Sequence, residues 1–211
     1  MKIGIYGGSF NPVHLGHIGI VKRAIEDLGL DLVKVVVANV SPFKTDTANE
    51  SFPWNREELV RAAFADIPKV EVDDRELRRG GVSYAIDTVR EIAAEHEGAE
   101  LYFIIGEDSL EGLPRWKDYE ELTKLCSFKA YPRTKESSSA IRKLFTDNKV
   151  VINPDSKLAN MVRQGVVRKN GFCPCRLPKL PEFFCPCDEF KGQLADCEYH
   201  GLCHCRLYLK P

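Results

Sequence analysis

The chain has 211 residues with 44% hydrophobic content, and its 30 Lys and Arg residues almost balance its 31 Asp and Glu residues, which gives a formal charge of −1. So small a charge supplies no long-range attraction to nucleic acid or to an anionic membrane, and any phosphate must be bound by local groups. No apolar run approaches the roughly 20 residues that span a bilayer, and the chain starts with a strand pattern instead of a targeting segment. These features exclude nucleic-acid and membrane binding and predict a cytoplasmic protein.

Short β-branched runs alternate with longer amphipathic segments through the first 133 residues. Strands are predicted at 2–6, 32–38, 69–72, 101–105 and 127–130. Helices are predicted at 17–28, 55–65, 84–95 and 119–125. This alternation predicts an α/β fold, a Rossmann-like parallel sheet with helices on both faces. Ligands of such a sheet bind at the carboxyl ends of the strands, near the point where the strand order reverses.

The pattern changes after residue 133, where the sequence predicts only two short helices, at 140–145 and 155–166. Seven of the eight cysteines lie between 173 and 205, among prolines that exclude long regular elements. A tail of about 40 residues buries too little apolar area to fold unaided, so something other than a hydrophobic core must hold it. In a chain without a secretory signal, clustered cysteines favour metal binding or redox chemistry over structural disulfides.

The stretch at 7–17 reads GGSFNPVHLGH and lies between the first predicted strand and the first predicted helix. Its glycines let the backbone approach a phosphate closely, and the leading amides of the helix point at the same place. His14 and His17 stand three residues apart, so both imidazoles can face a triphosphate. A glycine-rich turn with one capping histidine is the alternative, but paired histidines in a strand–loop–helix context favour the phosphate site.

This stretch resembles the signature of the nucleotidylyltransferase superfamily, a histidine, any residue, a glycine and a histidine after the first strand. Further segments resemble the nicotinate-mononucleotide adenylyltransferase family, and they read SPFK at 41–44, VSYAIDT at 82–88, FIIGEDSLEGLPRW at 103–116 and SSSAIR at 137–142. Ala85 stands where that family usually has threonine. The segment between residues 130 and 137 is shorter than the family's, so we expect either a remodelled adenine side of the pocket or a reduced activity.

The resemblance implies an enzyme that joins ATP, with Mg²⁺ bridging its phosphate oxygens, to nicotinate mononucleotide. The phosphates would be held by four side chains, His14, His17, Lys44 and Arg142. The other ATP-binding residues implied are Gly7, Gly8, Ser9, Phe10, Ser138 and Ser139. Those implied for the mononucleotide are Ser83, Tyr84, Asp87, Asp108 and Trp116, of which the tryptophan could equally be a core residue. Catalysis would consist of alignment and charge stabilisation, without a covalent nucleophile.

Two Cys-Pro-Cys units, at 173–175 and 185–187, and a Cys-His-Cys unit at 203–205 resemble the catalytic subunit of ferredoxin-thioredoxin reductase, which holds a [4Fe-4S] cluster beside a redox disulfide. The cluster ligands implied by this resemblance are Cys173, Cys185, Cys187 and Cys203. Cys175 and Cys205 would form the redox pair, and His204 would shuttle a proton or stabilise a thiolate. Zinc is the alternative, although single-residue spacings fit zinc knuckles poorly.

The two resemblances predict a nucleotidylyltransferase domain at 1–150, or as far as 167, and a ferredoxin-thioredoxin reductase-like iron–sulfur domain at 151–211. Residues 146–169 are claimed by both. Two other functions stay open. One is a disulfide-reducing redox protein, with ferredoxin or a thioredoxin-like protein as its partner, in which the N-terminal fold only binds nucleotide. The other is a different adenylyl transfer, such as that of phosphopantetheine, which the segment FIIGED disfavours. The sequence leaves the oligomeric state open.

Overall fold

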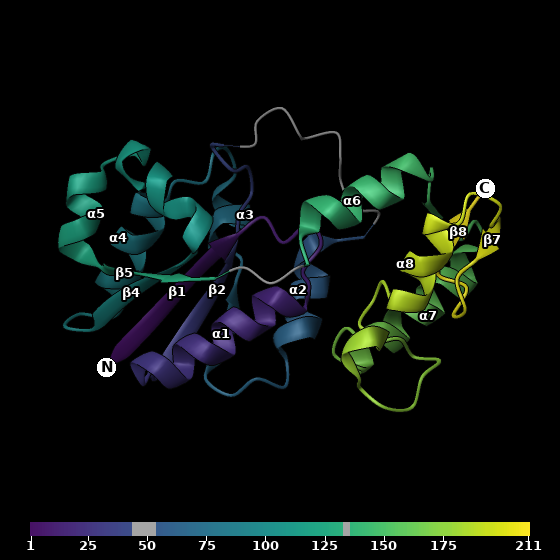
Figure 1. Cartoon of the computed structure of the whole chain (residues 1–211). Helices are drawn as coiled ribbons and strands as arrows, with labels where there is room; N and C mark the ends of the chain where they lie inside the picture. The colour runs from purple at the N-terminus through teal and green to yellow at the C-terminus, as the bar shows by residue number, and fades with distance from the viewer. Residues whose placement is uncertain (44–53, 133–135) are drawn as a thin grey trace. The chain divides into compact units, whose positions relative to one another are not determined.

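The computed structural model describes residues 1–43, 54–132 and 136–211, shown in Figure 1. Its internal contacts divide the chain into two compact units, each assembled from several segments. Unit 1 consists of Met1–Phe10, Gly16–Asn49 and Ile67–Lys135. Unit 2 consists of Asn11–Leu15, Glu50–Asp66 and Glu136–Pro211. This division differs from one boundary near residue 150, because two early segments group with the C-terminal part of the chain.

Unit 1 is built on a parallel five-stranded sheet with the order β3-β2-β1-β4-β5 among the described residues. Its strands are β1 (Lys2–Gly8), β2 (Leu32–Val37), β3 (Val70–Asp73), β4 (Glu100–Gly106) and β5 (Ser127–Tyr131). All five predicted strands are therefore confirmed. β1 pairs with β2 on one side and with β4 on the other, so the strand order reverses at β1. A ligand of this sheet is expected where β1 and β4 end.

Helices cover both faces of this sheet, as the sequence predicts. Figure 1 shows α1 (Leu15–Leu28) on one face and α4 (Ala85–Glu95) with α5 (Tyr119–Leu125) on the other. Ile3 and Ile5 of β1 belong to the core beneath α4, together with Ile86, Val89 and Ile92. Two elements were not predicted, the short α3 (Arg75–Arg79) and the 3-10 helix η2 (Glu107–Arg115). None of the helices in the described residues is long and apolar enough to cross a membrane.

Unit 2 contains helices from both halves of the sequence. They are α2 (Arg56–Phe64), α6 (Ser138–Asp147), α7 (Ser156–Arg168) and α8 (Asp188–Ala195), with the 3-10 helix η3 (Pro181–Phe183). The helices predicted at 55–65, 140–145 and 155–166 are confirmed as α2, α6 and α7, whereas α8 was not predicted. α2 packs against α7, and the Arg163 guanidinium of α7 lies 5.8 Å from the centre of the Trp54 ring.

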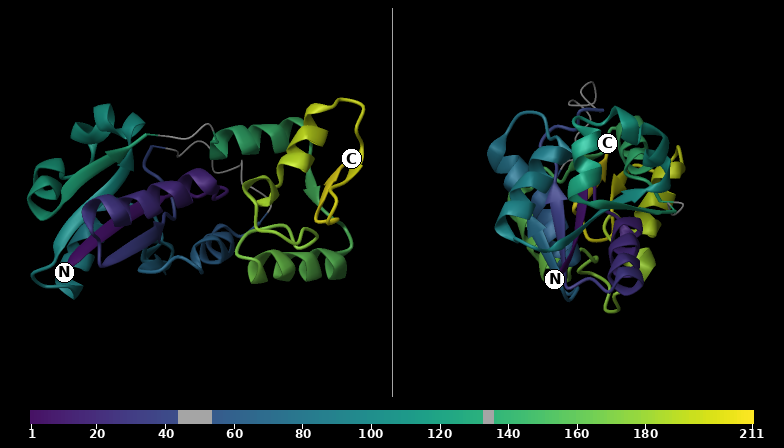
Figure 2. Two further views of the ribbon diagram at one scale, coloured as in Figure 1. Left: turned by 60° about the horizontal axis from the view of Figure 1, so that its bottom comes forward. Right: turned by 90° about the vertical axis from the view of Figure 1, so that its left-hand side faces the viewer.

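A small antiparallel sheet completes unit 2, with β6 (Val151–Ile152), β8 (Tyr208–Lys210) and β7 (Gly201–Leu202) side by side. The views of Figures 1 and 2 agree that α6 runs close to α8. Phe145 of α6 meets Phe190 and Tyr208 of the tail edge-on, with ring centres 6.0 and 5.1 Å away. All three side chains are buried. The expectation that the tail lacks a hydrophobic core is therefore wrong, because α6 contributes to one.

Candidate functional site

The end of β1 and the first turn of α1 place one histidine of the motif in unit 1. The His17 ring lies 5.0 Å from the Phe10 ring and 6.2 Å from the Tyr6 ring, centre to centre. Gly8 favours this packing, because a Cβ at this position would stand 3.0 Å from the Phe10 ring and the ring would have to shift. Phe10 is 2% exposed, whereas His17 is half-buried. The loop thus holds the imidazole in a fixed place at the carboxyl end of the sheet, where Gly7 and Ser9 also lie.

The other histidine and the late signature lie in unit 2. The Ser138 hydroxyl donates a hydrogen bond to the Pro12 carbonyl at 2.8 Å. Arg142 Nη1 donates to the Asn11 carbonyl at 2.7 Å. Segments that are more than 120 residues apart in the sequence are therefore in direct contact. The loop that accepts these two hydrogen bonds from α6 also carries His14, which is 8% exposed.

The start of α6 is suited to an anion. Ser137 caps the helix, since its hydroxyl accepts a hydrogen bond from the Ala140 amide at 3.1 Å. The first turn carries no acidic residue, and the carboxylate of Glu136, just before the cap, lies 3.3 Å from the Lys191 ammonium group, so the positive end of the helix dipole is available to an anion. Arg142 also reaches Ser139 Oγ at 3.3 Å, and its Nε has no hydrogen-bond partner among the described residues. Ser138, Ser139 and Arg142 are thus brought together, as the resemblance implies.

The residues expected to bind the mononucleotide fall into two groups within unit 1. Ser83 is 9% exposed, and its hydroxyl accepts a hydrogen bond from the Asn39 amide at 2.9 Å, which fixes the loop after β2. Tyr84 and Asp87, at the start of α4, both contact Lys117. The ammonium group of Lys117 lies 4.6 Å above the Tyr84 ring and 3.6 Å from Asp87 Oδ2. Lys117 directly follows Trp116, so Tyr84 and Asp87 lie near that tryptophan.

Trp116 is half-buried, and its contacts show one of the two roles considered for it, packing against the core. Its ring packs edge-on against Phe103 at 5.5 Å and Phe128 at 6.0 Å, and lies 6.4 Å from Phe43. One side therefore belongs to the core. A hollow of about 600 Å³ beside it is lined by Pro114, Trp116, Asp118, Tyr119, Glu120, Glu121 and Lys124. Because three of these side chains are carboxylates, this hollow does not suit an anionic mononucleotide.

The remaining expected residues divide between described and undescribed parts of the chain. Asp108 is exposed in η2, directly after β4, at the strand end where a ligand is expected. Lys44 lies outside the described residues. Two residues of this region, Lys117 and Asn39, were not predicted from the sequence. Lys117 could have been noticed as a cation beside Trp116, but no local signal pairs Asn39 with Ser83, 44 residues away.

The cysteines of the tail gather in unit 2, and all are free. The four expected ligands and Cys205 are buried, whereas Cys175 and Cys197 are exposed. Cys203 Sγ and Cys205 Sγ lie 3.5 Å apart. Hydrogen bonds also join the Cys173 thiol to Cys205 and to Cys175. Cys173 therefore contacts both members of the expected redox pair.

Backbone amides and a tyrosine contact three of the expected ligands. The Tyr208 amide donates a hydrogen bond to Cys203 Sγ at 3.2 Å. Tyr208 Oη lies 3.7 Å from Cys185 Sγ, in hydrogen-bond contact. Cys187 directly precedes α8, and the Phe190 amide is bonded to its sulfur. Such hydrogen bonds to sulfur are a common feature around protein-held iron–sulfur clusters.

The protonation of these thiols depends on their contacts with one another. A hydrogen bond from Cys205 lowers the pKa of Cys173 to about 6 and that of Cys203 to about 7, against the opposing effect of burial. The same two bonds raise the pKa of Cys205. Burial raises the pKa of Cys185 and Cys187, and charge on Cys173 or Cys203 raises both further. The four expected ligands therefore influence one another electrostatically.

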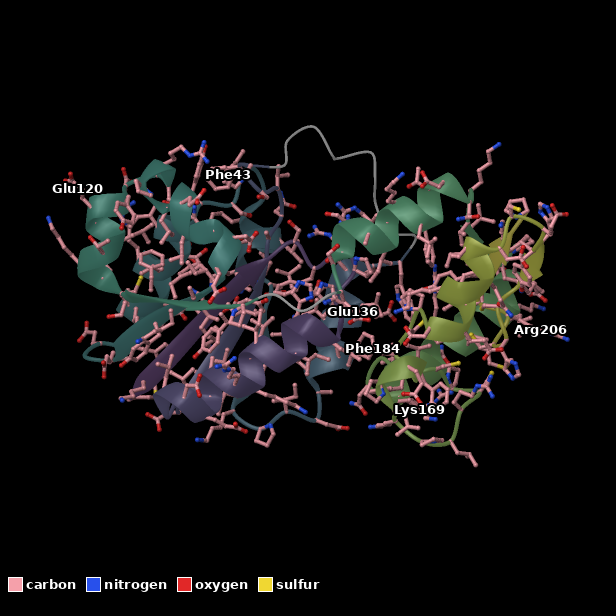
Figure 3. The ribbon with its side chains drawn as sticks, in the orientation of Figure 1. Phe43, Glu120, Glu136, Lys169, Phe184 and Arg206 are labelled. Atoms are coloured by element: carbon pink, nitrogen blue, oxygen red, sulfur yellow. The ribbon has the colours of Figure 1, made fainter. Side chains whose placement is uncertain are left out.

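His204 and the loop after the first Cys-Pro-Cys unit are both connected to α8. His204 is half exposed, and its Nδ1 lies 3.9 Å from Glu189 Oε1. Arg176 forms an ion pair with the same carboxylate. Lys169, labelled in Figure 3, donates to the carbonyls of Cys173 and Leu177. Within the described residues, no group of three or more His, Cys, Asp or Glu side chains stands in the arrangement of a metal-ion site.

Comparison with known proteins places this site in context. A family model described as cytidylyltransferase-like matches residues 5–165, ahead of all seven tail cysteines. A protein of Aliarcobacter butzleri named probable nicotinate-nucleotide adenylyltransferase is 37% identical over 148 residues, which cover 70% of this chain and 80% of that protein. A protein of the same name from Nitratiruptor is 42% identical over 128 residues, or 61% of this chain and 71% of that protein.

Solved structures give the same picture of the fold. A Vibrio parahaemolyticus protein assigned as nicotinate-nucleotide adenylyltransferase superposes with a TM-score of 0.56 at 25% identity, over 70% of this chain and 88% of that one. Plasmodium falciparum nicotinic acid mononucleotide adenylyltransferase in complex with NaAD superposes with a TM-score of 0.53 at 18% identity, over 68% of this chain and 83% of that one. At that identity the second likeness concerns the fold alone.

Proposed function

Since the chain belongs to the cytidylyltransferase-like family and, within it, to the relatives of nicotinate-nucleotide adenylyltransferases, we propose that it transfers AMP from ATP to nicotinate mononucleotide. The products are nicotinate adenine dinucleotide, an intermediate of NAD biosynthesis, and pyrophosphate. The mononucleotide phosphate forms a bond to the α-phosphorus of ATP while the bond from that phosphorus to the β-phosphate oxygen breaks. ATP brings Mg²⁺ with it as a counterion.

In this proposal the chain's own residues provide charge stabilisation. Negative charge grows on the departing pyrophosphate, and imidazole, guanidinium and ammonium donors stabilise it best when they are already in position. His14 and His17 hold the α- and β-phosphates, and Arg142 with Lys44 brackets the β- and γ-phosphates. Ser138, Ser139 and the amides of the first turn of α6 add uncharged donors. The mononucleotide lies along Tyr84, Asp87 and Trp116, with Asp108 accepting hydrogen bonds from its hydroxyls.

What supports the proposal most is the contact between α6 and the loop that carries His14. Ser138 and Arg142 bond to the carbonyls of Pro12 and Asn11, across 126 and 131 residues of sequence. A transferase needs such a contact, because its two phosphate-binding motifs must converge on one triphosphate. Nothing in the hydrophobic pattern of either segment requires them to meet.

Pyrophosphate release from ATP, measured with a panel of acceptors, tests the proposal. We expect turnover with nicotinate mononucleotide and weaker turnover with nicotinamide mononucleotide. 4′-Phosphopantetheine serves as the control acceptor for the rival adenylyl transfer. Absence of release with nicotinate mononucleotide contradicts the proposal, and release with 4′-phosphopantetheine alone would favour the rival.

For the tail we propose a second function, disulfide reduction beside a [4Fe-4S] cluster. What supports it is a set of six thiols in three units of two. The four expected ligands among them are buried, and three of these, Cys173, Cys187 and Cys203, accept hydrogen bonds from backbone amides. Thiolates are the ligands of iron–sulfur clusters and of many zinc sites, but among the described residues these sulfurs do not stand in the arrangement of a metal-ion site, so the proposal rests on the residue types and their spacing. Cys173, Cys185, Cys187 and Cys203 would hold the cluster, which would supply single electrons.

The redox step itself concerns the other two thiols. Reduced Cys175 and Cys205 pass two electrons and two protons to a substrate disulfide and become a disulfide themselves. Two one-electron transfers from a ferredoxin-like carrier, with two protons from solvent, restore both thiols. His204 lies beside Cys205 in the chain and would move a proton. Cys173, which contacts both sulfurs, would keep the two thiols near each other.

Metal analysis of anaerobically purified protein tests this second proposal. We expect iron and sulfide in equal amounts, a brown colour, and loss of both in Cys173→Ser. Cys205→Ser is the matched control, since it should keep the iron and lose only the reduction of a model disulfide. A colourless protein that contains zinc would refute the cluster.

A further inference from the structure

α6 connects the phosphate-binding loop with the cysteine-rich tail. Ser138, the first residue of α6, and Arg142, one turn later, donate hydrogen bonds to the carbonyls of Pro12 and Asn11. Three positions after Arg142, Phe145 is 4% exposed and packs into the core of the tail. The helix has ten residues and is therefore about 15 Å long. A rigid rod of this length cannot move at one end without moving at the other.

The tail holds α6 by contacts of several kinds. Phe145 lies edge-on to Phe190 and Tyr208, whose own rings stack 5.8 Å apart at an interplanar angle of 11°. Lys191 of α8 lies 3.3 Å from the carboxylate of Glu136, the residue labelled in Figure 3 just before α6 begins. β6, which follows α6 after a short turn, pairs with β8. Side-chain packing, charge and backbone pairing thus all fix the helix to the tail.

The tail residues that hold α6 also contact the thiols. Tyr208 donates its amide to Cys203 Sγ at 3.2 Å, and its hydroxyl lies 3.7 Å from Cys185 Sγ. The Phe190 amide is bonded to Cys187. Any rearrangement of these three thiols therefore displaces the two rings against which Phe145 packs. Dense aromatic packing transmits such shifts because it leaves no free volume to absorb them.

From this chain of contacts we propose that Phe190 and Tyr208 are positioning residues for ATP. They act through Phe145, which fixes α6 and so the placement of Arg142 and Ser138 at the triphosphate. The arrangement of the thiols consequently affects the affinity for ATP. By linkage, bound ATP shifts the equilibrium between arrangements of the thiols by the same factor. The inference rests on the adenylyl transfer proposed above and deepens it by adding control from the tail.

Substitution of Phe190 by leucine in the full chain tests the proposal. Phe190→Leu keeps an apolar side chain but removes the stacking partner of Tyr208, and we expect the KM for ATP to rise about tenfold, within the range usual for coupled sites. The KM for nicotinate mononucleotide should not change, because the residues proposed to bind it belong to unit 1. Unfolding of the whole chain would affect both substrates alike, so a selective rise for ATP excludes it, and an unchanged urea transition for thiol exposure excludes local unfolding of the tail.

A milder pair of variants keeps the test valid if Phe190→Leu fails to fold. Lys191→Met removes the ion pair with Glu136 and should raise the KM for ATP by a smaller factor, whereas Lys191→Arg should restore it. Asp147→Asn is the matched control on α6, because it breaks only the exposed pair with Lys143. Folded variants with an unchanged KM for ATP, or with both KM values raised together, would overturn the proposal.

Reciprocity gives a readout that does not depend on turnover. Cys205 is 8% exposed, so alkylation must await a local opening of the tail. ATP should slow this alkylation, while the exposed Cys197 reacts at the same rate throughout. An ATP-independent rate at Cys205 contradicts the coupling. If adenylyl transfer itself is absent, the proposed function fails, and the protection of Cys205 by ATP still decides the coupling.

Discussion

Unit 1 and the tail of unit 2 stabilise their folds in different ways. In unit 1 every strand pairs in parallel with its neighbours, and the core beneath α4 and α5 is built entirely from the unit's own residues. In the tail the strands have two or three residues, and one of the three rings at its core comes from α6. A unit with enough apolar area is self-sufficient, whereas a small one relies on a neighbour or on its thiols.

This difference in construction matches the division of proposed tasks. The residues expected at the mononucleotide lie on the self-sufficient sheet, where strand ends hold side chains in fixed places. The thiols lie on short elements whose order depends on α6 and on their own contacts. Variants that damage one region should therefore leave the other measurable, and the predictions that follow use this, from the largest expected effect to the smallest.

Removal of the His17 imidazole should have the largest effect. We expect His17→Ala to lower kcat by about 10²–10³-fold, the usual result of deleting one donor that stabilises transition-state charge. His17→Phe should lose as much, because it preserves packing against Phe10 but lacks the ring nitrogens. His96→Ala is the control. His96 lies at the C-terminal end of α4, whereas the residues proposed to bind the mononucleotide lie at its start, so this variant should retain full activity. Normal turnover in His17→Phe would show that the ring serves only packing.

Gly171→Ala should unfold the tail without harm to the sheet of unit 1. Gly171 has φ of +90°, and a Cβ there would lie 2.7 Å from the ring of Phe184, which is itself 5% exposed. Overpacking and a strained backbone together cost about 2–4 kcal/mol. We expect the thiols, measured with a thiol reagent, to become exposed at a lower urea concentration than in the wild type. The circular dichroism of the parallel sheet should still be present at that concentration. Simultaneous loss of both signals would show that the regions unfold as one.

Local patterns predicted the regular elements of unit 1 and failed where tertiary contacts decide. β4 was recognisable because five successive residues are buried, which makes a continuous apolar run. α3 has only five residues and depends on distant partners, such as Thr88, whose hydroxyl donates to Glu76. α8 was overlooked because prolines dominate the segment before it, although it begins just after the last of them, Pro186.

The candidate site was predictable only as far as motifs extend. Motif resemblance indicated that Ser138 and Arg142 serve the same ligand as the N-terminal loop, a relation that no periodicity contains. It did not indicate the role of Phe145, which reads as an ordinary apolar position of a helix. Its partners Phe190 and Tyr208 lie 45 and 63 residues further along the chain. Contacts at such separations leave no trace in a local pattern, so they became visible only in the structure.

An ion pair within unit 1 should make its stability depend on pH. Burial by itself would raise the pKa of Asp73, but hydrogen bonds from Arg75 keep that pKa below its ordinary value. The stabilisation is therefore complete above the unfolded pKa of about 3.9 and is lost as the pH falls through the lower folded value. Asp73→Asn should lower the free energy of unfolding by about 1–3 kcal/mol at neutral pH.

Unfolding measured between neutral and acid pH checks this, because the difference between the wild type and Asp73→Asn should begin to shrink below pH of about 4 and vanish once the pH has fallen below the lowered folded pKa of Asp73. Asp27→Asn is the control, since its pair with Arg23 is exposed and should contribute about 0–1 kcal/mol at any pH. A difference that persists in acid would mean that packing, not charge, explains the variant.

The smallest expected effect is a gain in the stability of the tail. Gly192 lies inside α8, with no atom within 4 Å of the place where a Cβ would stand. Gly192→Ala should therefore stabilise the helix by about 0.5–1 kcal/mol. Gly19→Ala, in open space on α1, is the matched change in unit 1. If the two regions unfold separately, each substitution should delay only its own transition. Because α8 has only eight residues and carries Phe190, the gain at Gly192 should also slow alkylation of Cys205, which Gly19→Ala should not do.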